Sequence, residues 1–273
     1  MSELRAKQTH LADLLGAMDS ILVAYSGGVD SAFLAHAAEQ ARPGRVLLVT
    51  ADSASYPKRH REMAERLAGE FGWRHEFVAT AELERPEYRA NPSNRCYYCK
   101  NELYTHLTSI ARERGFAVVV DGNNADDRGD FRPGRQAARE FGVRSPLDEA
   151  DLTKAEIRQL SREAGLPIWD EPASACLSSR IPYASEVTEP KLQMIERAED
   201  ALRALGFRIF RVRHHDVLAR LEIGRDEMAR ALDPDVNAAL VKQLKAIGYQ
   251  YVSLDLQGYR TGSLNEVLRL TPA

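Results

Sequence analysis

The chain has 273 residues, of which 44% are hydrophobic and 28% charged, so it is long enough for one large or two modest domains with a real core. These proportions exclude a disordered, collagen-like or repeat-rich chain. The 37 Lys and Arg residues against 40 Asp and Glu give a net charge of -3 without blocks of like charge. Global charge therefore gives no reason to expect a nucleic-acid partner.

The N-terminal segment is polar and charged where a secretory signal would be apolar, and no apolar run approaches the length of a membrane span. We therefore expect a cytoplasmic protein with no membrane partner. The chain has three cysteines, Cys96, Cys99 and Cys176, which is an odd number for a protein of a reducing compartment. Each thiol is then a candidate for core packing, metal binding or chemistry rather than half of a structural disulfide.

Apolar strands that alternate with amphipathic helices predict a parallel sheet in the first part of the chain. The expected elements are a helix over 4–18, a strand at 21–25, a helix after the glycines at 27–28, a strand at 46–50, a helix over 57–72, a strand near 77–78, a helix over 100–115 and a strand at 117–120. A last helix begins at the capping box of Thr153 and Glu156 and ends at Gly165. We assign these elements to a first domain over 1–170.

Periodicity is lost over 171–187, where proline and small residues predict a long loop or linker. Beyond it the expected elements are a helix over 192–205, strands at 209–212 and 217–223, two helical stretches and a strand at 251–254. They predict a smaller C-terminal α+β domain over 188–273. The predicted fold class is α/β, with a parallel-sheet domain followed by this smaller domain.

The segment Ser26-Gly27-Gly28-Val29-Asp30-Ser31 follows an apolar strand and precedes a helix. Glycines at such a turn let backbone N–H groups at a helix N-terminus approach anionic oxygens, and the serine hydroxyls add donors. The Gly-Lys-Ser/Thr ending of a Walker A loop is missing. The carboxylate of Asp30 beside phosphates suggests a bridging Mg²⁺. The alternative is an ordinary glycine-rich turn between strand and helix.

This loop, AYSGGVDS, together with VTADS after the second strand, resembles the PP-loop ATP pyrophosphatase superfamily. Its members cleave ATP between the α and β phosphates and adenylate a carbonyl oxygen. The resemblance implies that the pyrophosphate portion of ATP is held by Ser26, Gly27, Gly28, Asp30 and Ser31. It implies that adenosine lies near Asp52 and Ser53.

Cys176 stands in the aperiodic segment EPASACLSSRIPY, close to Ser178, Ser179 and Arg180. A guanidinium near a thiol favours the nucleophilic thiolate, and an ATP site that activates carboxylates makes a thioester a reasonable next step. The alternative is that Cys176 only fills the core, as most free cysteines do. Its polar, aperiodic surroundings argue against that alternative.

Further stretches resemble one PP-loop family over nearly the whole chain: NRCYYCKNELY at 94–104, DGNNADD at 121–127, SPL at 145–147, WDEPASACLSSRIPY at 169–183, RVRHHD at 211–216 and DLQGYRTGSLNE at 255–266. The family is LarE, the ATP-dependent sacrificial sulfur transferases of nickel-pincer nucleotide synthesis, which serve lactate racemase maturation. The resemblance implies a small-molecule nucleotide substrate, ATP and Mg²⁺ as cofactors, and a homo-oligomer.

The resemblance also implies a mechanism. ATP adenylates a carboxylate of pyridinium-3,5-biscarboxylic acid mononucleotide, and Cys176 displaces AMP to form a thioester. Loss of the Cα proton of Cys176 then breaks its C–S bond, so that sulfur leaves with the substrate and dehydroalanine remains. The base that removes this proton is not evident from the sequence.

The cations that we expect to bind the acidic substrate are Arg180, Arg211, Arg213 and Arg260. Arg211 and Arg213 alternate along a predicted strand and therefore share a face, although an exposed polar strand face is the alternative. Beside Asp30, the candidate metal ligands or bases are Glu199, Asp200 and Glu222, residue types that usually lie on a solvated surface.

Cys96 and Cys99 form a C-x-x-C pair that has no second pair or H-x-x-x-H partner in the chain. We expect them to be structural or redox-inert. An iron–sulfur cluster shared with Cys176 is a less favoured alternative, which would require the three thiols to meet in space.

Two rival functions remain. One is a different PP-loop enzyme, a tRNA thiolase or an amidating synthetase, against which stand the net negative charge and the lack of room for an RNA-binding or glutaminase domain. The other is a non-catalytic protein that binds an adenine nucleotide or coenzyme A. Pyrophosphate release separates this second rival from both enzymes.

Overall fold

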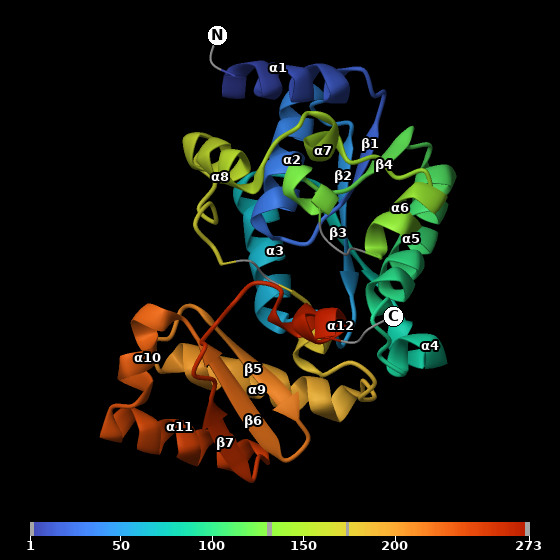
Figure 1. Cartoon of the computed structure of the whole chain (residues 1–273). Helices are drawn as coiled ribbons and strands as arrows, with labels where there is room; N and C mark the ends of the chain where they lie inside the picture. The colour runs from blue at the N-terminus through green and yellow to red at the C-terminus, as the bar shows by residue number, and fades with distance from the viewer. Residues whose placement is uncertain (1–2, 130–132, 173–174, 271–273) are drawn as a thin grey trace. The chain divides into compact units, whose positions relative to one another are not determined.

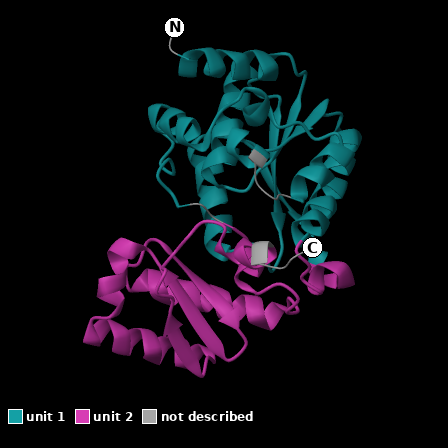
Figure 2. Cartoon of the chain, viewed as in Figure 1, with its two compact units in different colours: residues 1–82, 94–173 teal, residues 83–93, 174–273 magenta. Residues whose placement is uncertain are grey.

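The computed structural model describes residues 3–129, 133–172 and 175–270. The chain divides into two compact units (Figure 2). The first unit comprises Met1–Glu82 and Asn94–Ala173, and the second comprises Leu83–Ser93 and Ser174–Ala273. The short segment 83–93, which the sequence assigns to the first domain, is grouped with the second unit.

The first unit is built on a four-stranded parallel sheet in the order β3-β2-β1-β4 (Figure 1). Its strands are β1 (Ile21–Ala24), β2 (Val46–Asp52), β3 (His75–Ala79) and β4 (Val118–Val120). All three pairings between neighbouring strands are parallel. Every residue of β1 is buried, as expected of a central parallel strand covered on both faces. The predicted α/β class is confirmed.

Helices cover both faces of this sheet. The α-helices of the first unit are α1 (Glu3–Gly16), α2 (Val29–Ala41), α3 (Lys58–Glu70), α5 (Arg95–Arg114), α6 (Gly134–Glu140), α7 (Pro146–Glu149) and α8 (Lys154–Glu163), and its short 3₁₀ turns are η1 (Glu82–Glu84), at the unit boundary, and η2 (Ala125–Gly129). Ile21 and Val23 pack with α1, α2, α3 and α8, while Leu22 and Ala24 pack with α5 and α6. The side-chain alternation of a strand thus builds two cores, one on each face.

The second unit is a three-stranded mixed sheet in the order β5-β6-β7. Its elements are α4 (Pro86–Arg89), η3 (Leu177–Arg180), α9 (Glu189–Ala204), β5 (Phe210–His215), β6 (Leu218–Ile223), α10 (Arg225–Ala231), α11 (Pro234–Ile247), β7 (Tyr251–Leu254), η4 (Ser263–Asn265) and α12 (Glu266–Leu270). The β5–β6 pair is antiparallel and the β6–β7 pair is parallel. This confirms a smaller α+β domain after the parallel-sheet domain.

One face of the second sheet is apolar and the other is polar. Phe210, Val212 and Leu221 belong to a buried cluster with residues of α9 and α11. The alternate positions on β5 and β6 carry Arg211, Arg213, Arg220 and Glu222. Because side chains alternate across a strand, these charged residues share the second face.

The described part of the predicted linker is not an open loop. It contains the η3 turn, and Leu177, Ile181 and Val187 are buried. The buried amide of Asn91 donates to the carbonyls of Pro182 and Ser185, at 2.7 and 2.9 Å. The aperiodic segment is therefore irregular but packed, because the side-chain amide of Asn91 satisfies backbone carbonyls of this segment. Within the described ranges, no helix is both long and apolar enough to cross a lipid bilayer.

Candidate active site

The glycine loop of the first unit turns sharply between β1 and α2. Gly27 has φ +66°, and a Cβ on it would lie 3.0 Å from the Cβ of Ala64 in α3. A side chain at Gly27 is therefore excluded both by the left-handed backbone and by the neighbouring helix. Gly28, at φ -80°, is the N-cap of α2 and offers no side chain to cap it. Among the described residues, the N-cap position therefore supplies no side-chain acceptor to the first N–H groups of α2, and such a helix start can bind anions.

Two serine hydroxyls brace this loop. The Ser31 hydroxyl donates to the Gly28 carbonyl at 3.1 Å and accepts from the backbone N–H of Ser26 at 3.1 Å. The Ser26 and Ser31 hydroxyls are also 3.1 Å apart, and Tyr56 donates its hydroxyl to the Ser26 carbonyl at 3.0 Å. Ser31 is buried and Ser26 is exposed. Ser31 therefore holds the loop in shape, and Ser26 is the hydroxyl open to a ligand.

Asp30, in the first turn of α2, forms an ion pair with Lys154, a residue not predicted from the sequence to belong to the site. Its Oδ2 accepts a hydrogen bond from the ammonium of Lys154 at the start of α8. Its Oδ1 is buried without a hydrogen-bond partner among the described residues. Burial raises the pKa of the Asp30 carboxyl, and the charge of Lys154 opposes that rise only in part. A buried carboxylate oxygen without a partner suits a divalent cation, so these residues fit Mg²⁺ beside phosphates.

The segment after β4 adds residues to the site for which the sequence predicted no individual role. A Cβ on Gly122 would lie 3.1 Å from the Ser31 backbone nitrogen, so only glycine lets this segment approach the start of α2. The charge of Asp127 contributes to the raised pKa of Asp30. Asp126 accepts from the Lys154 backbone N–H at 2.8 Å, and the predicted capping box of Thr153 is present. These contacts fix Lys154 where it meets Asp30.

Asp52 and Ser53, expected near adenosine, lie at the carboxyl end of β2, where Asp52 is the last residue of the strand and Ser53 follows it. Asp52 accepts a hydrogen bond from Nε of Arg61 at 3.1 Å. The hydroxyls of Ser53 and Ser55 both donate to Oε1 of the buried Glu82, each at 2.6 Å. Glu82 therefore fixes the shape of this turn. Glu82 could not be predicted from local sequence, because it lies 29 residues from Ser53.

Cys176 precedes the η3 turn in the second unit and is a free, half-buried thiol. Arg180 is 2% exposed, and its Nη1 donates to the carbonyls of Ala175 and Cys176 at 2.7 and 2.9 Å. Its Nε and Nη2 donate to Glu199 at 2.8 and 2.9 Å. The sequence predicts Arg180 as a substrate ligand, but its guanidinium is committed to the cysteine loop and to Glu199. Arg180 therefore positions the segment that carries Cys176.

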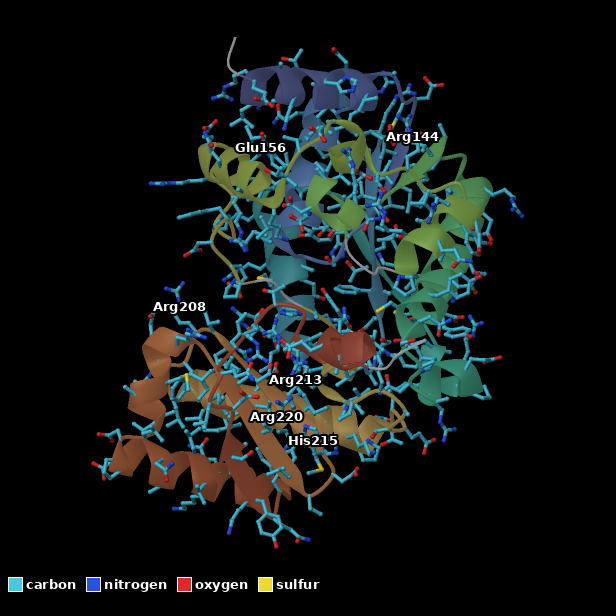
Figure 3. All side chains as sticks on the ribbon, viewed as in Figure 1. Arg144, Glu156, Arg208, Arg213, His215 and Arg220 are labelled. Atoms are coloured by element: carbon cyan, nitrogen blue, oxygen red, sulfur yellow. The ribbon has the colours of Figure 1, made fainter. Side chains whose placement is uncertain are left out.

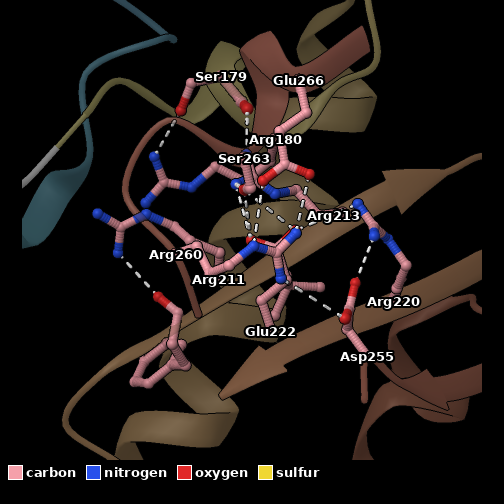
Figure 4. A network of polar contacts seen from close by, with 12 residues as sticks. Ser179, Arg180, Arg211, Arg213, Arg220, Glu222, Asp255, Arg260, Ser263 and Glu266 are labelled. Carbon is pink, nitrogen blue, oxygen red and sulfur yellow. Dashed lines mark hydrogen bonds and ion pairs between the residues drawn. The ribbon is translucent and has the colours of Figure 1, made fainter. Parts of the chain in front are cut away.

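Arg211 and Arg213 lie on the polar face of the second sheet, as their alternation predicts (Figure 4). Figure 3 labels Arg213 and Arg220 on the two strands of this sheet that pair with each other. Arg213 donates to the Ser179 carbonyl at 2.7 Å, to Glu222 at 2.7 Å and to the Ser263 hydroxyl at 2.6 Å. The guanidinium of Arg211 lies over the Tyr259 ring, 5.1 Å from its centroid. Burial lowers the pKa of Arg211, and the nearby charge of Arg180 lowers it further.

The network continues across β6 and into the C-terminal segment (Figure 4). Arg220, which pairs with Arg213 across the two strands, donates to Glu222 at 3.2 Å and also pairs with Asp255. Arg260 forms a two-point contact with Glu266 at 3.1 and 3.0 Å. The network holds five guanidinium groups and four carboxylates: Arg180, Arg211, Arg213, Arg220, Arg260, Glu199, Glu222, Asp255 and Glu266. The network therefore holds one more guanidinium group than carboxylates.

The structure does not support Glu199, Asp200 and Glu222 as a metal site. Both oxygens of Glu199 are taken by Arg180, and those of Glu222 by arginines and Ser263. Asp200 points elsewhere on α9, where it pairs with Arg203 at 2.7 Å. Within the parts of the chain that the structure describes, no three His, Cys, Asp or Glu side chains are grouped to hold a metal ion. Sequence could not show that guanidinium groups satisfy these carboxylates.

Cys96 and Cys99 lie in the first turns of α5, and neither forms a disulfide. Cys96 is exposed and Cys99 is half-buried. His214 is buried with its Nδ1 2.9 Å from the Tyr249 hydroxyl. It therefore belongs to the core of the second unit.

The parallel sheet, the helix start after two glycines and the carboxylate in the first turn of that helix are consistent with the PP-loop fold class. No protein-family model matches the chain. The chain is 35% identical to pyridinium-3,5-bisthiocarboxylic acid mononucleotide synthase of Lactiplantibacillus plantarum over 98% of its length and 97% of that protein. It therefore belongs to the LarE family, and it is an enzyme.

Two further relatives are uncharacterized proteins. The chain is 44% identical to one from Synechocystis over 97% of its length and 99% of that protein. It is 32% identical to another from Methanocaldococcus jannaschii over 63% of its length and 66% of that protein. The first of these likenesses spans both units of the chain.

Proposed function

We propose that this enzyme inserts sulfur into pyridinium-3,5-biscarboxylic acid mononucleotide, with ATP and Mg²⁺ as cofactors and with Cys176 as the sulfur donor. The proposal rests on membership of the LarE family and on one observation: within the described residues, α2 starts without a capping side chain and Oδ1 of Asp30 in its first turn has no hydrogen-bond partner. A phosphate-bearing ligand with a divalent cation satisfies both groups at once.

The first unit then supplies carboxylate activation. Backbone N–H groups of α2 and the hydroxyl of Ser26 bind the β and γ phosphates. Asp30 and Lys154 place one negative and one positive charge beside these phosphates. Asp30 would hold Mg²⁺, which would withdraw charge from the phosphate oxygens. The substrate carboxylate attacks the α phosphorus of ATP, the bond to the β phosphate breaks, and pyrophosphate leaves. Asp52 and Ser53 are proposed to adjoin the adenosine.

The second unit supplies the sulfur. The thiolate of Cys176 attacks the activated carbonyl, and AMP leaves as the thioester forms. Removal of the Cα proton of Cys176 forms a Cα=Cβ bond as the Cβ–Sγ bond breaks. The electron pair leaves with sulfur as a thiocarboxylate, and residue 176 remains as dehydroalanine. Cations on the polar sheet face, Arg211, Arg213 and Arg260, are proposed to bind the phosphate and carboxylate groups of the nucleotide.

Mass spectrometry of the intact protein after incubation with ATP, Mg²⁺ and the biscarboxylate mononucleotide tests the proposal. We expect Cys176 to lose the mass of H₂S in step with thiolated product, and pyrophosphate to be released. Cys176→Ala should still release pyrophosphate and form no thiolated product. Thiolated product with an unchanged Cys176 would contradict the sacrificial step and point to another sulfur source.

The controls are variants of the two other cysteines. Cys96→Ala and Cys99→Ala should thiolate the substrate as the unaltered enzyme does, because we expect both thiols to be inert. Loss of thiolation in both variants would favour an iron–sulfur cluster instead. A failure to release pyrophosphate with any carboxylate substrate would favour the non-catalytic alternative.

A further inference from the structure

The backbone carbonyl of Cys176 accepts more hydrogen bonds than the η3 turn requires. The Ser179 N–H donates to it at 3.0 Å, which is the ordinary bond of a 3₁₀ turn. The Ser179 hydroxyl also donates to it, at 2.8 Å, and Nη1 of Arg180 donates to it at 2.9 Å. Three donors, one of them cationic, therefore converge on an oxygen that has two lone pairs.

These donors are held in place before any reaction occurs. Arg180 is 2% exposed, and its Nε and Nη2 are fixed by the two oxygens of Glu199, which is itself buried. Nη1 of Arg180 also donates to the Ser179 hydroxyl at 2.9 Å, so that the hydroxyl is polarised toward the carbonyl. Burial acts against the charge of Glu199, but the pair with Arg180 outweighs it and keeps the pKa of this carboxyl low.

The elimination step of the proposed function places negative charge on this same oxygen. When the Cα proton of Cys176 passes to a base, the electron pair at Cα is conjugated with the carbonyl of the same residue. The charge of the resulting enolate is carried largely by the carbonyl oxygen. The pair then forms the Cα=Cβ bond, the Cβ–Sγ bond breaks, and sulfur leaves with its electrons as the thiocarboxylate. No oxidant or reductant is needed.

We propose that the Ser179 hydroxyl and N–H and the Arg180 guanidinium form an oxyanion hole for the Cys176 carbonyl, which stabilises the enolate on the way to dehydroalanine. The inference rests on the proposed function, whose elimination step it explains. The donors lie at 2.8–3.0 Å from the oxygen that gains charge, within the range that stabilises oxyanions in acyl-transfer enzymes. Arg180 thus acts on the reacting cysteine and not on the substrate.

The alternative is that these contacts only shape the turn. A turn needs the Ser179 N–H, but it needs neither side-chain donor. The two roles differ in the intermediate that accumulates when a donor is removed. A misplaced Cys176 attacks poorly, so the acyl adenylate accumulates. A weakened oxyanion hole leaves attack intact and slows elimination, so the thioester on Cys176 accumulates.

Single-turnover mass spectrometry of Ser179→Ala, with pyrophosphate measured in parallel, separates these outcomes. We expect pyrophosphate release and thioester formation at the rate of the unaltered enzyme, and conversion of the thioester to dehydroalanine slowed by about 100-fold. Ser179→Thr, which keeps the hydroxyl, should restore conversion. The matched control is Ser178→Ala, whose hydroxyl lies 2.6 Å from that of Tyr88, and it should convert normally.

A second variant, Arg180→Lys, keeps a buried cation beside Glu199 while it removes the planar group that serves both contacts. It too should accumulate thioester. Acyl adenylate without thioester in Ser179→Ala, or dehydroalanine formed at the normal rate, would overturn the oxyanion hole. Failure of the proposed function is distinguishable, because the unaltered enzyme itself would then form no dehydroalanine.

Discussion

The ammonium of Lys154 forms an ion pair with Asp30 across 124 residues of sequence, and joins the first turn of α8 to that of α2. The pair places one positive charge beside the carboxylate whose second oxygen has no described partner. Because burial raises the pKa of Asp30, the charged carboxylate depends on Lys154 or on a bound cation.

We expect Asp30→Asn to abolish the Mg²⁺ dependence of pyrophosphate release and to slow that release by about 100-fold. Its stability should change little, because a buried charge is removed together with its desolvation cost. Lys154→Met should instead lower the free energy of unfolding by about 1 kcal/mol, since it leaves the Asp30 carboxylate without a counter-charge. Pyrophosphate assays over a range of Mg²⁺ and chemical denaturation measure both effects.

The control for Lys154→Met is Lys191→Met, which removes a 3.0 Å surface pair with the exposed Asp216. It should change stability by less than about 0.5 kcal/mol and leave pyrophosphate release unaltered. An Asp30→Asn enzyme with the normal Mg²⁺ response would show that Asp30 does not hold the cation.

Gly27→Ala and Gly28→Ala make a matched pair in the phosphate loop. At Gly27 the positive φ and the contact with Ala64 should cost about 1–3 kcal/mol of stability. At Gly28 the backbone is ordinary, and a Cβ would meet only the Ser26 hydroxyl, at 3.5 Å. Thermal unfolding should therefore separate the two variants. Equal melting temperatures would show that the loop relaxes around Ala64.

Glu222→Gln tests the centre of the arginine network. Glu222 is fully buried and accepts hydrogen bonds from Arg213, Arg220 and Ser263. Its neutralisation leaves buried guanidinium charge without compensation, so we expect a loss of about 3 kcal/mol in urea denaturation. The exposed pair of Glu266 with Arg260 is the control, and Glu266→Gln should cost less than about 1 kcal/mol. Equal losses in the two variants would contradict a buried network.

His214 should make the second unit less stable in acid. Burial lowers its pKa to about 4, from an ordinary value of 6.5, so the unfolded chain binds a proton that the folded chain excludes between these values. The contribution of His214 to the free energy of unfolding is complete above about pH 6.5 and falls by roughly 3 kcal/mol as the pH drops toward 4. His214→Gln should remove that part of the pH dependence when unfolding is followed by denaturant titration. The same slope in both proteins would assign it to other groups.

Local sequence was enough to predict the alternation of strands and helices, the capping box at Thr153, the glycine loop and the shared face of Arg211 and Arg213. Each of these depends on residues a few positions apart, where backbone sterics, side-chain periodicity and local hydrogen bonds decide the conformation. The family likeness could be drawn from the same local stretches, and the relative from Lactiplantibacillus plantarum confirms it.

The pairing of charged groups, in contrast, depends on the three-dimensional fold. The fold brings Lys154 into contact with Asp30, Glu82 with Ser53 and Arg180 with Glu199. The predicted substrate ligand Arg180 became a group that holds the cysteine loop, and the predicted metal ligand Glu199 became its counter-charge. The physical reason is that a buried charge must be compensated by whichever partner the topology brings within reach, and no local pattern records that partner.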